Sequence, residues 1–405
     1  MSVQKMVRKS VAWSCLGGVL LSFSAGAQQA SQGIRLLDDK LTISPAVDIG
    51  VMYDSNIIFN HTDTGDFIYR VNPSLNMKYV GTDWGMMGNA WYAHNWYDKY
   101  DVKDNHRWGE TYGISYDSPK GVRGFLRESY IESDQNDSWS LNDGDGIWRN
   151  RMQFDVVGGI SYDLSERLSA TLHGMYSDIW YENDSNAYYP LYGWKQWSLG
   201  GELAHKLTER SAVLLSASYQ EYFTDGKDYL NRFDNTSYGY SLMGGVMSRA
   251  TERIRYRALL GATMYDYAGT QSYAPSYMLD ATWMISSKLA ATVAGASYFQ
   301  PSERDYTQRR TVYTISGGLT YSPVKRVRLT LDGLYRGDEN ETVKEYSSAV
   351  DYSRNQYTVR LRASYQLQKY VSVYCAGEYT YQDSNRMVQD QWDRYLISVG
   401  MSLRY

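Results

Sequence analysis

The last stretch of the chain, residues 391–405, alternates between apolar and polar positions. One face carries the apolar side chains Tyr395, Ile397, Val399, Met401, Leu403 and Tyr405. The other face carries Arg394, Ser398, Gly400, Ser402 and Arg404. A period of two is that of a β-strand with one apolar and one polar face. Because this strand ends the sequence on an aromatic residue, the pattern is typical of a strand that closes a barrel in an outer membrane.

The same alternation begins at Leu41 and recurs to the end of the chain. Short and long connections follow one another in turn. The eight short ones are 81–85, 118–121, 164–167, 207–210, 250–253, 286–288, 322–325 and 367–369. The nine long ones are roughly 54–66, 98–106, 132–149, 182–191, 224–235, 268–272, 300–309, 337–352 and 382–391.

These connections predict an all-β fold, a transmembrane antiparallel up-and-down β-barrel over residues 41–405. The expected number of strands is eighteen, with sixteen as the alternative. An even number places both ends of the barrel on the side of the short turns, which is the periplasmic side in bacterial outer-membrane barrels.

The first 27 residues have the features of a secretory signal peptide. Lys5, Arg8 and Lys9 precede an apolar run at 11–23, and Ala25-Gly26-Ala27 is an A-x-A cleavage site. The run is too short to span a bilayer. Residues 28–40 are polar and are expected to form a short periplasmic segment. The expected location is the outer membrane of a Gram-negative bacterium, with loops at the cell surface. Only Cys375 remains after the signal peptide, so an internal disulfide is not expected.

The aromatic composition agrees with a membrane protein, although the mean hydropathy of −0.52 is that of a soluble one. The chain has 40 Tyr and 12 Trp but only 8 Phe, which favours rings with a polar group at a membrane–water interface. In a membrane barrel only alternate residues face lipid, which keeps the mean hydropathy low. A tyrosine-rich soluble β-sandwich is the alternative, and it would fractionate without membrane.

The long connections are acidic and the strands and short turns are basic, within a net charge of −4. Alternation turns a group of arginines toward the lumen, because charge on the lipid-facing side is costly. The candidates are Arg255, Arg257, Arg326, Arg328, Arg360 and Arg362, with Arg123 and Arg127 on another strand. One interpretation is a wall in which arginines pair with carboxylates and water. The other is an electropositive constriction that favours anionic solutes.

Catalytic and metal-binding motifs are weak, and we expect neither enzymatic activity nor a cofactor. None of the five His has metal-ligand spacing, and His94 with a nearby Ser or Asn is the sole candidate for a surface active site, without a nucleophile elbow. Connection 132–149 contains calcium-type oxygen ligands, namely Asp134, Asp137, Asp143 and Asp145. It lacks the spacing and the closing Glu of an EF-hand, so a solvated acidic loop is favoured.

Two short motifs carry a family resemblance. Tyr53-Asp54-Ser55-Asn56 follows the first expected strand, and Asn72-Pro73-Ser74-Leu75 lies in the second. Together with turns of the type Leu164-Ser165-Glu166-Arg167, they resemble the beta-barrel porin 2 family of bacterial outer-membrane proteins. The resemblance implies an outer-membrane barrel, brings no catalytic residues, and links such proteins to surface-polysaccharide export systems.

The predicted function is that of a porin-like channel for passive diffusion of small polar solutes, with anionic or carbohydrate solutes favoured. The alternative is a structural or binding barrel with a closed lumen, linked to surface polysaccharide or a surface assembly. Expected partners are outer-membrane lipid, lipopolysaccharide, the barrel-assembly machinery during biogenesis and small polar solutes. Nucleic acid is not expected, and the oligomeric state stays open.

Overall fold

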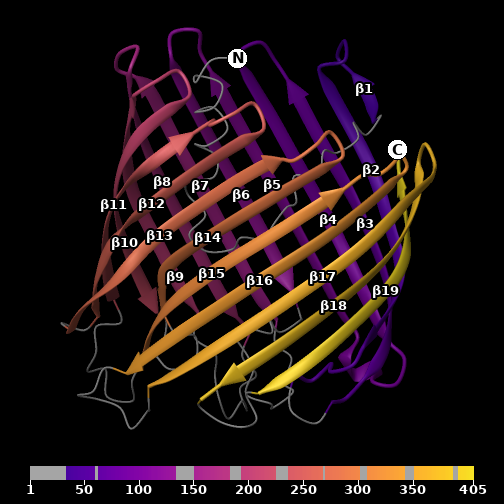
Figure 1. Ribbon diagram of the computed structural model, residues 1–405. Coiled ribbons are helices and arrows are strands. Elements are labelled where there is room, and N and C mark those ends of the chain that lie inside the picture. Colours follow the sequence, from indigo (N-terminus) through magenta and orange to yellow (C-terminus); the bar gives the residue numbers. More distant parts are fainter. Residues whose placement is uncertain are drawn as a thin grey trace.

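The computed structural model describes residues 33–59, 63–133, 150–182, 193–224, 236–267, 270–301, 308–342, 351–385 and 391–405. Eighteen long strands form the wall of a barrel (Figure 1). They are β2 (Leu41–Asp54), β3 (Asp66–Val80), β4 (Trp84–Tyr97), β5 (Asn105–Asp117), β6 (Val122–Ser133), β7 (Arg151–Asp163), β8 (Leu168–Tyr181), β9 (Trp194–Lys206), β10 (Ser211–Thr224), β11 (Thr236–Ser248), β12 (Ile254–Tyr267), β13 (Thr270–Met284), β14 (Leu289–Pro301), β15 (Gln308–Tyr321), β16 (Val327–Thr342), β17 (Tyr352–Gln368), β18 (Val371–Ser384) and β19 (Trp392–Arg404).

Each of these strands pairs antiparallel with the next one, and β19 pairs with β2, which closes the barrel. The predicted up-and-down barrel of eighteen strands is therefore confirmed. Figure 1 shows the short turns at one end and the longer connections at the other, with the C-terminus on the side of the short turns. These two ends are called the turn end and the loop end below.

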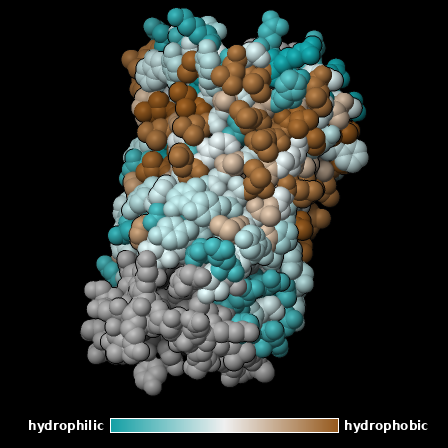
Figure 2. All heavy atoms as spheres, turned by 90° about the vertical axis from the view of Figure 1, so that its left-hand side faces the viewer, coloured by the Kyte–Doolittle hydropathy of each residue, from teal (hydrophilic) through white to brown (hydrophobic). Residues whose placement is uncertain are grey.

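Alternation along each strand separates an apolar outer face from a mostly polar inner face. In β12, Leu260 is 71% exposed on the outside, whereas its neighbour Leu259 points inward and is 1% exposed. Figure 2 shows the outer apolar side chains gathered in a belt nearer the turn end, between hydrophilic zones. Exposed apolar side chains at alternate positions are stable where lipid covers them, so the belt marks the part of the wall that lies in the membrane.

Two details differ from the sequence-based expectation. The segment 28–40, for which the sequence predicts no strand, contains the short strand β1 (Ile34–Leu36), which pairs with the start of β2. Strand β16 extends to Thr342, into a stretch assigned to a long connection, because it keeps pairing with β15 there. The end of β16 is polar on both faces, so its sequence does not alternate. A short 3-10 helix, η2 (Asp101–Lys103), lies between β4 and β5.

The ladder between β13 and β14 is incomplete. Its pairing stops at Met278 and Ala296, although both strands continue toward the loop end and keep their other neighbours. Ser297 partly replaces the missing backbone bonds: its Oγ accepts from the amide of Tyr277 at 3.0 Å and donates to the carbonyl of Pro275 at 3.2 Å. Proline has no N–H to leave unpaired, which suits an open strand edge.

Beyond this point β14 lies on the inner side of the wall formed by β10 and β12. Phe299 has the outward parity of its strand, yet it is buried and stacks on the inward-facing Tyr265, with ring centroids 4.6 Å apart. The hydroxyl of Tyr222, another inward-facing residue, donates to the carbonyl of Phe299 at 2.6 Å. Aromatic packing thus replaces backbone pairing in this part of the wall.

The open edge of β13 predicts an alternating pattern of amide hydrogen exchange. The amides of Gln271 and Tyr273 point in the same direction as that of Tyr277, toward the missing partner, whereas those of Ser272 and Ala274 point toward β12. We expect exchange of the first two amides to be much faster, because they lack a ladder hydrogen bond. Exchange measured by NMR in detergent micelles would test this, and equal protection of all four amides would contradict the open edge.

Candidate functional site

The inner face of the barrel is the candidate site, because it is polar and is enclosed by the wall. Small hydroxyl and amide side chains alternate inward on many strands. Among them are Ser161, Ser169, Gln196, Ser216, Thr263, Ser276, Gln356 and Gln382. Thr263 and Ser276 are hydrogen-bonded at 2.5 Å across the β12–β13 ladder. These side chains make the inner face polar, although each of them is buried among its neighbours.

Alternation places the arginines of β12 on this inner face. Arg257 reaches across β11 and β10 and forms an ion pair with Glu202 on β9. Asp280 lies directly opposite Arg257 on β13. Arg257 therefore has a carboxylate on each side. Arg255, two residues nearer the turn end, is exposed and lies opposite Thr282.

The arginines of β16 and β17 form a separate group. Arg360 donates from Nε to Glu378 at 2.7 Å, and Asp332 lies opposite it on β16. The guanidinium carbon of Arg362 lies 4.0 Å from the centroid of the Tyr374 ring, a cation–π contact.

The remaining two candidates lie nearer the turn end. Arg328 lies opposite Ser364 on the inner face, and Arg326 is exposed in the turn before β16. The six arginines thus do not form one cluster: two lie on β12, and the others lie on or beside β16 and β17. Of the two further candidates, Arg123 is ion-paired with Asp163 at 2.8 Å.

A buried ionic network lies on the inner face near the loop end. Asp338 on β16 is 3.0 Å from Arg354 and 3.9 Å from Arg310, and its side chain is fully buried. The amide of Asn340 donates to the same carboxylate at 3.3 Å. A buried carboxylate is tolerated when cations and hydrogen bonds surround it. This network joins three consecutive strands, β15, β16 and β17.

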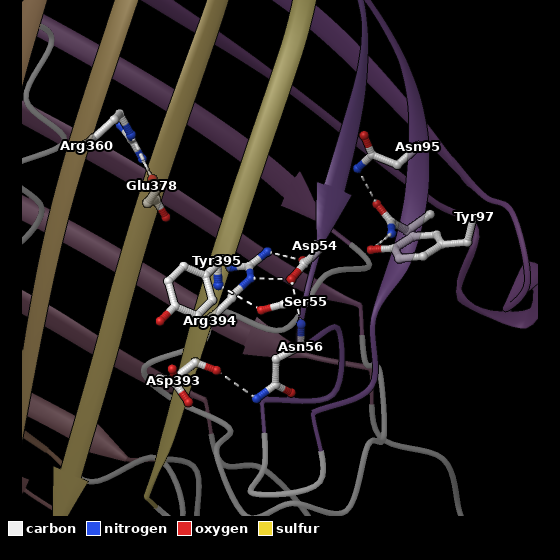
Figure 3. A network of polar contacts seen from close by, with 11 residues as sticks. Asp54, Ser55, Asn56, Asn95, Tyr97, Arg360, Glu378, Asp393, Arg394 and Tyr395 are labelled. Atoms are coloured by element: carbon white, nitrogen blue, oxygen red, sulfur yellow. Dashed lines mark hydrogen bonds and ion pairs between the residues drawn. The ribbon is translucent and has the colours of Figure 1, made fainter.

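A second ionic contact joins the first and last strands of the barrel (Figure 3). Arg394 on β19 donates from Nε to Asp54 on β2 at 2.8 Å, and a second nitrogen contacts the other carboxylate oxygen. Ser55 and Asn56 continue the connection: the Ser55 Oγ accepts from the amide of Tyr395 at 2.8 Å, and the Asn56 side-chain amide donates to the carbonyl of Asp393 at 3.0 Å. The motif Tyr53-Asp54-Ser55-Asn56 therefore has a structural role: it fastens β2 to β19.

Sequence reasoning did not single out Asp54, Asp338, Arg354 and Arg394 as candidate site residues. Their position in the alternation was a usable signal, since Arg394 falls on the polar face of the last strand and Asp54 on the polar face of the first. Asp338 and Arg354 lay within or beside a stretch assigned to a connection. The pairing partners themselves depend on neighbouring strands, which the sequence pattern of one strand does not identify.

The other candidate sites are the possible calcium ligands and His94. Asp134, Asp137, Asp143 and Asp145 lie outside the described residues. Within the described ranges, no group of three or more His, Cys, Asp or Glu side chains is arranged to hold a metal ion. His94 faces outward, its ring centroid 4.3 Å from that of Trp96, and its Nδ1 is 3.3 Å from the Tyr92 hydroxyl. These neighbours are those of an aromatic patch at the membrane interface.

Comparisons with known proteins support the fold. No family model and no curated protein matches this sequence. The chain is similar to the FrpB iron transporter of Neisseria meningitidis in its apoprotein form, with a TM-score of 0.50, 8% identity, and coverage of 91% of this chain and 82% of that one. It is also similar to the siderophore receptor PirA of Pseudomonas aeruginosa, with a TM-score of 0.42, 11% identity, and coverage of 90% and 80%.

The similarity to FrpB shows a shared barrel fold, and at 8% identity it carries no information about the ligand. The closed antiparallel sheet with its apolar belt is the fold of an outer-membrane β-barrel. In the part of the chain that the structure describes, none of the helices is long and apolar enough to cross a membrane.

Proposed function

We propose that this barrel is a channel through which small polar solutes diffuse passively across the outer membrane. The observation that carries the proposal is the closed barrel of eighteen strands, apolar outside and lined with hydroxyl, amide and charged side chains inside. Barrels of 16–18 strands leave room for an aqueous channel. Neither a cofactor nor a covalent step is required, because the concentration gradient drives the flux.

The proposal is tested by the conductance of residues 28–405, refolded and inserted into a planar lipid bilayer. Stable current steps are expected, together with slower migration in SDS after heating, which reports a folded barrel. A folded barrel that carries no current would contradict the channel.

Arg328 is expected to contribute to ion selectivity, because it faces the lumen near the turn end. Replacing it with Glu changes the lumen charge by two units, so the ratio of anion to cation permeability should fall, as measured by the reversal potential under a salt gradient. The matched control is Arg210→Glu, which makes the same change on an exposed turn outside the lumen. An equal shift of the reversal potential in both variants would show that the effect comes from net charge alone.

A second candidate function is a binding or structural barrel with a closed lumen. Burial of inner-face residues near the loop end favours it: Tyr222, Tyr265, Asn340 and Gln382 are all almost completely buried. Such a barrel would fold normally, remain electrically silent and bind a surface assembly or polysaccharide through its loop end. The conductance measurement separates the two candidates.

The surroundings of the barrel are part of the same proposal. Lipid and lipopolysaccharide would contact the outer face. There the Tyr112 hydroxyl donates to Glu110 at 3.0 Å in the middle of β5, and the Tyr130 hydroxyl donates to Glu132 at 3.0 Å near the loop end of β6. The barrel-assembly machinery would insert the chain after export. The resemblance to the beta-barrel porin 2 family stays a prediction.

A further inference from the structure

We infer that the inner wall holds a binding pocket for a small oxyanion, a phosphate or a carboxylate, formed by strands β2 to β5 and β19. A cavity of about 150 Å³ lies on the inner face near the loop end. Its lining is Met52, Ile68, Arg70, Asn95, Tyr97, Arg107, Arg394 and Leu396. The inference rests on the proposed aqueous lumen, because the pocket must be reached by solutes from that side.

Three arginines from three separated strands converge on this pocket. Arg70 comes from β3, Arg107 from β5 and Arg394 from β19. The ladder brings Arg70 and Asn95 opposite each other. Ala93 lies opposite Arg107, and its small side chain leaves space for the long arginine side chain. The guanidinium of Arg107 also lies 5.9 Å from the centre of the Trp91 ring.

The pocket is rich in positive charge and hydrogen-bond donors. Asp54 neutralises Arg394 from outside the lining, whereas Arg70 forms no ion pair within the described part of the chain. The buried Nε of Arg70 has no hydrogen-bond acceptor. After Asp54, the next inward-facing carboxylate is that of Asp66 on β3. It accepts hydrogen bonds from the backbone amides of Lys99 and Tyr100 at 3.0 and 3.1 Å.

A buried donor without an acceptor costs free energy, and so does the mutual repulsion of guanidinium groups around one cavity. An oxyanion would relieve both costs, because its oxygens accept charge-assisted hydrogen bonds from the arginine side chains.

The size of the cavity limits the ligand. The cavity volume of about 150 Å³ is well below the ~300–1,000 Å³ of pockets for drug-sized ligands. The lining also includes three apolar side chains, Met52, Ile68 and Leu396. The ligand class is therefore a small oxyanion held by its charged end, rather than a large chelate or an oligosaccharide.

The test is calorimetric titration of the refolded barrel in detergent with inorganic phosphate at low salt. The barrel is expected to bind phosphate, and Arg70→Gln should weaken binding by about tenfold or more, the equivalent of ~1.4 kcal/mol. Arg70→Lys keeps the charge but loses the forked donor, so its loss should be smaller. The matched control is Lys78→Gln, which removes a positive charge from the inner face of the same strand, outside the pocket lining.

The outcomes are distinguishable. Phosphate binding that is lost in Arg70→Gln and kept in Lys78→Gln supports the pocket, provided that both variants show heat-modifiable migration. Absence of binding to the unmodified barrel, or an equal loss in both variants, would overturn it. Steady conductance without phosphate binding would reject the pocket and keep the channel, whereas binding by an electrically silent barrel would reject the channel alone.

Discussion

Replacing Asp338 with Ala is expected to lower the free energy of unfolding by about 3–5 kcal/mol, the usual cost of removing one partner from a buried ion pair. Arg310 and Arg354 would then lie buried without their shared carboxylate, since their side chains are only 4% and 7% exposed. Asn340 would also lose an acceptor. Asp338→Asn, which keeps an acceptor but not the charge, should have a smaller effect.

Reversible urea unfolding in detergent micelles measures this loss. Glu339→Ala is the matched control, because it removes a carboxylate from the adjacent position, which is exposed on the outer face. Equal unfolding midpoints for the two alanine variants would show that the network around Asp338 contributes nothing to stability.

Gly261→Ala is expected to destabilise the β11–β12 ladder by about 3 kcal/mol or more, at the upper end of overpacking effects. A Cβ atom at this position would lie 1.9 Å from the carbonyl oxygen of Leu242 and 2.7 Å from the Cα of Met243. These are backbone atoms, so a rotamer change does not relieve the clash. A Cβ atom at the nearby Gly245 on β11 would make the equivalent clash, because it would lie 1.9 Å from the carbonyl oxygen of Ala258.

The measurement is the fraction of refolded protein that migrates as a folded barrel in unheated SDS samples. Gly333→Ala is the control, because no atom lies within 4 Å of a Cβ at that position. Should both alanine variants refold to the same extent, the close approach of β11 and β12 would not be a requirement of the fold.

The fold was largely predictable because a barrel repeats a local pattern. Alternation identifies each strand and its outer face without knowledge of any partner, and the turns mark where the chain reverses. The end of β16 was not predicted, because polar residues occupy both faces there. The break in pairing between β13 and β14 was not predicted either, since it depends on where β14 packs relative to β10 and β12.

The candidate site was less predictable, because side chains on the inner wall reach several strands away. The sequence placed Arg257 and Arg360 on the inner face but did not identify Glu202 or Glu378 as their partners. The contact between Arg257 and Glu202 crosses two intervening strands, so it depends on the curvature and stagger of the wall. The pocket around Arg70 likewise combines residues from both ends of the chain.

The fastening of β2 to β19 has a consequence for how the barrel forms. All other neighbouring barrel strands are consecutive in sequence, whereas Asp54 and Arg394 are 340 positions apart. Contacts between such distant positions pay the entropy of closing a long loop and form slowly. The sheet must therefore grow with two unpaired edges until the last strand arrives. Unpaired edges invite association with other chains, so the interval before closure is the period in which this protein is most prone to mispairing.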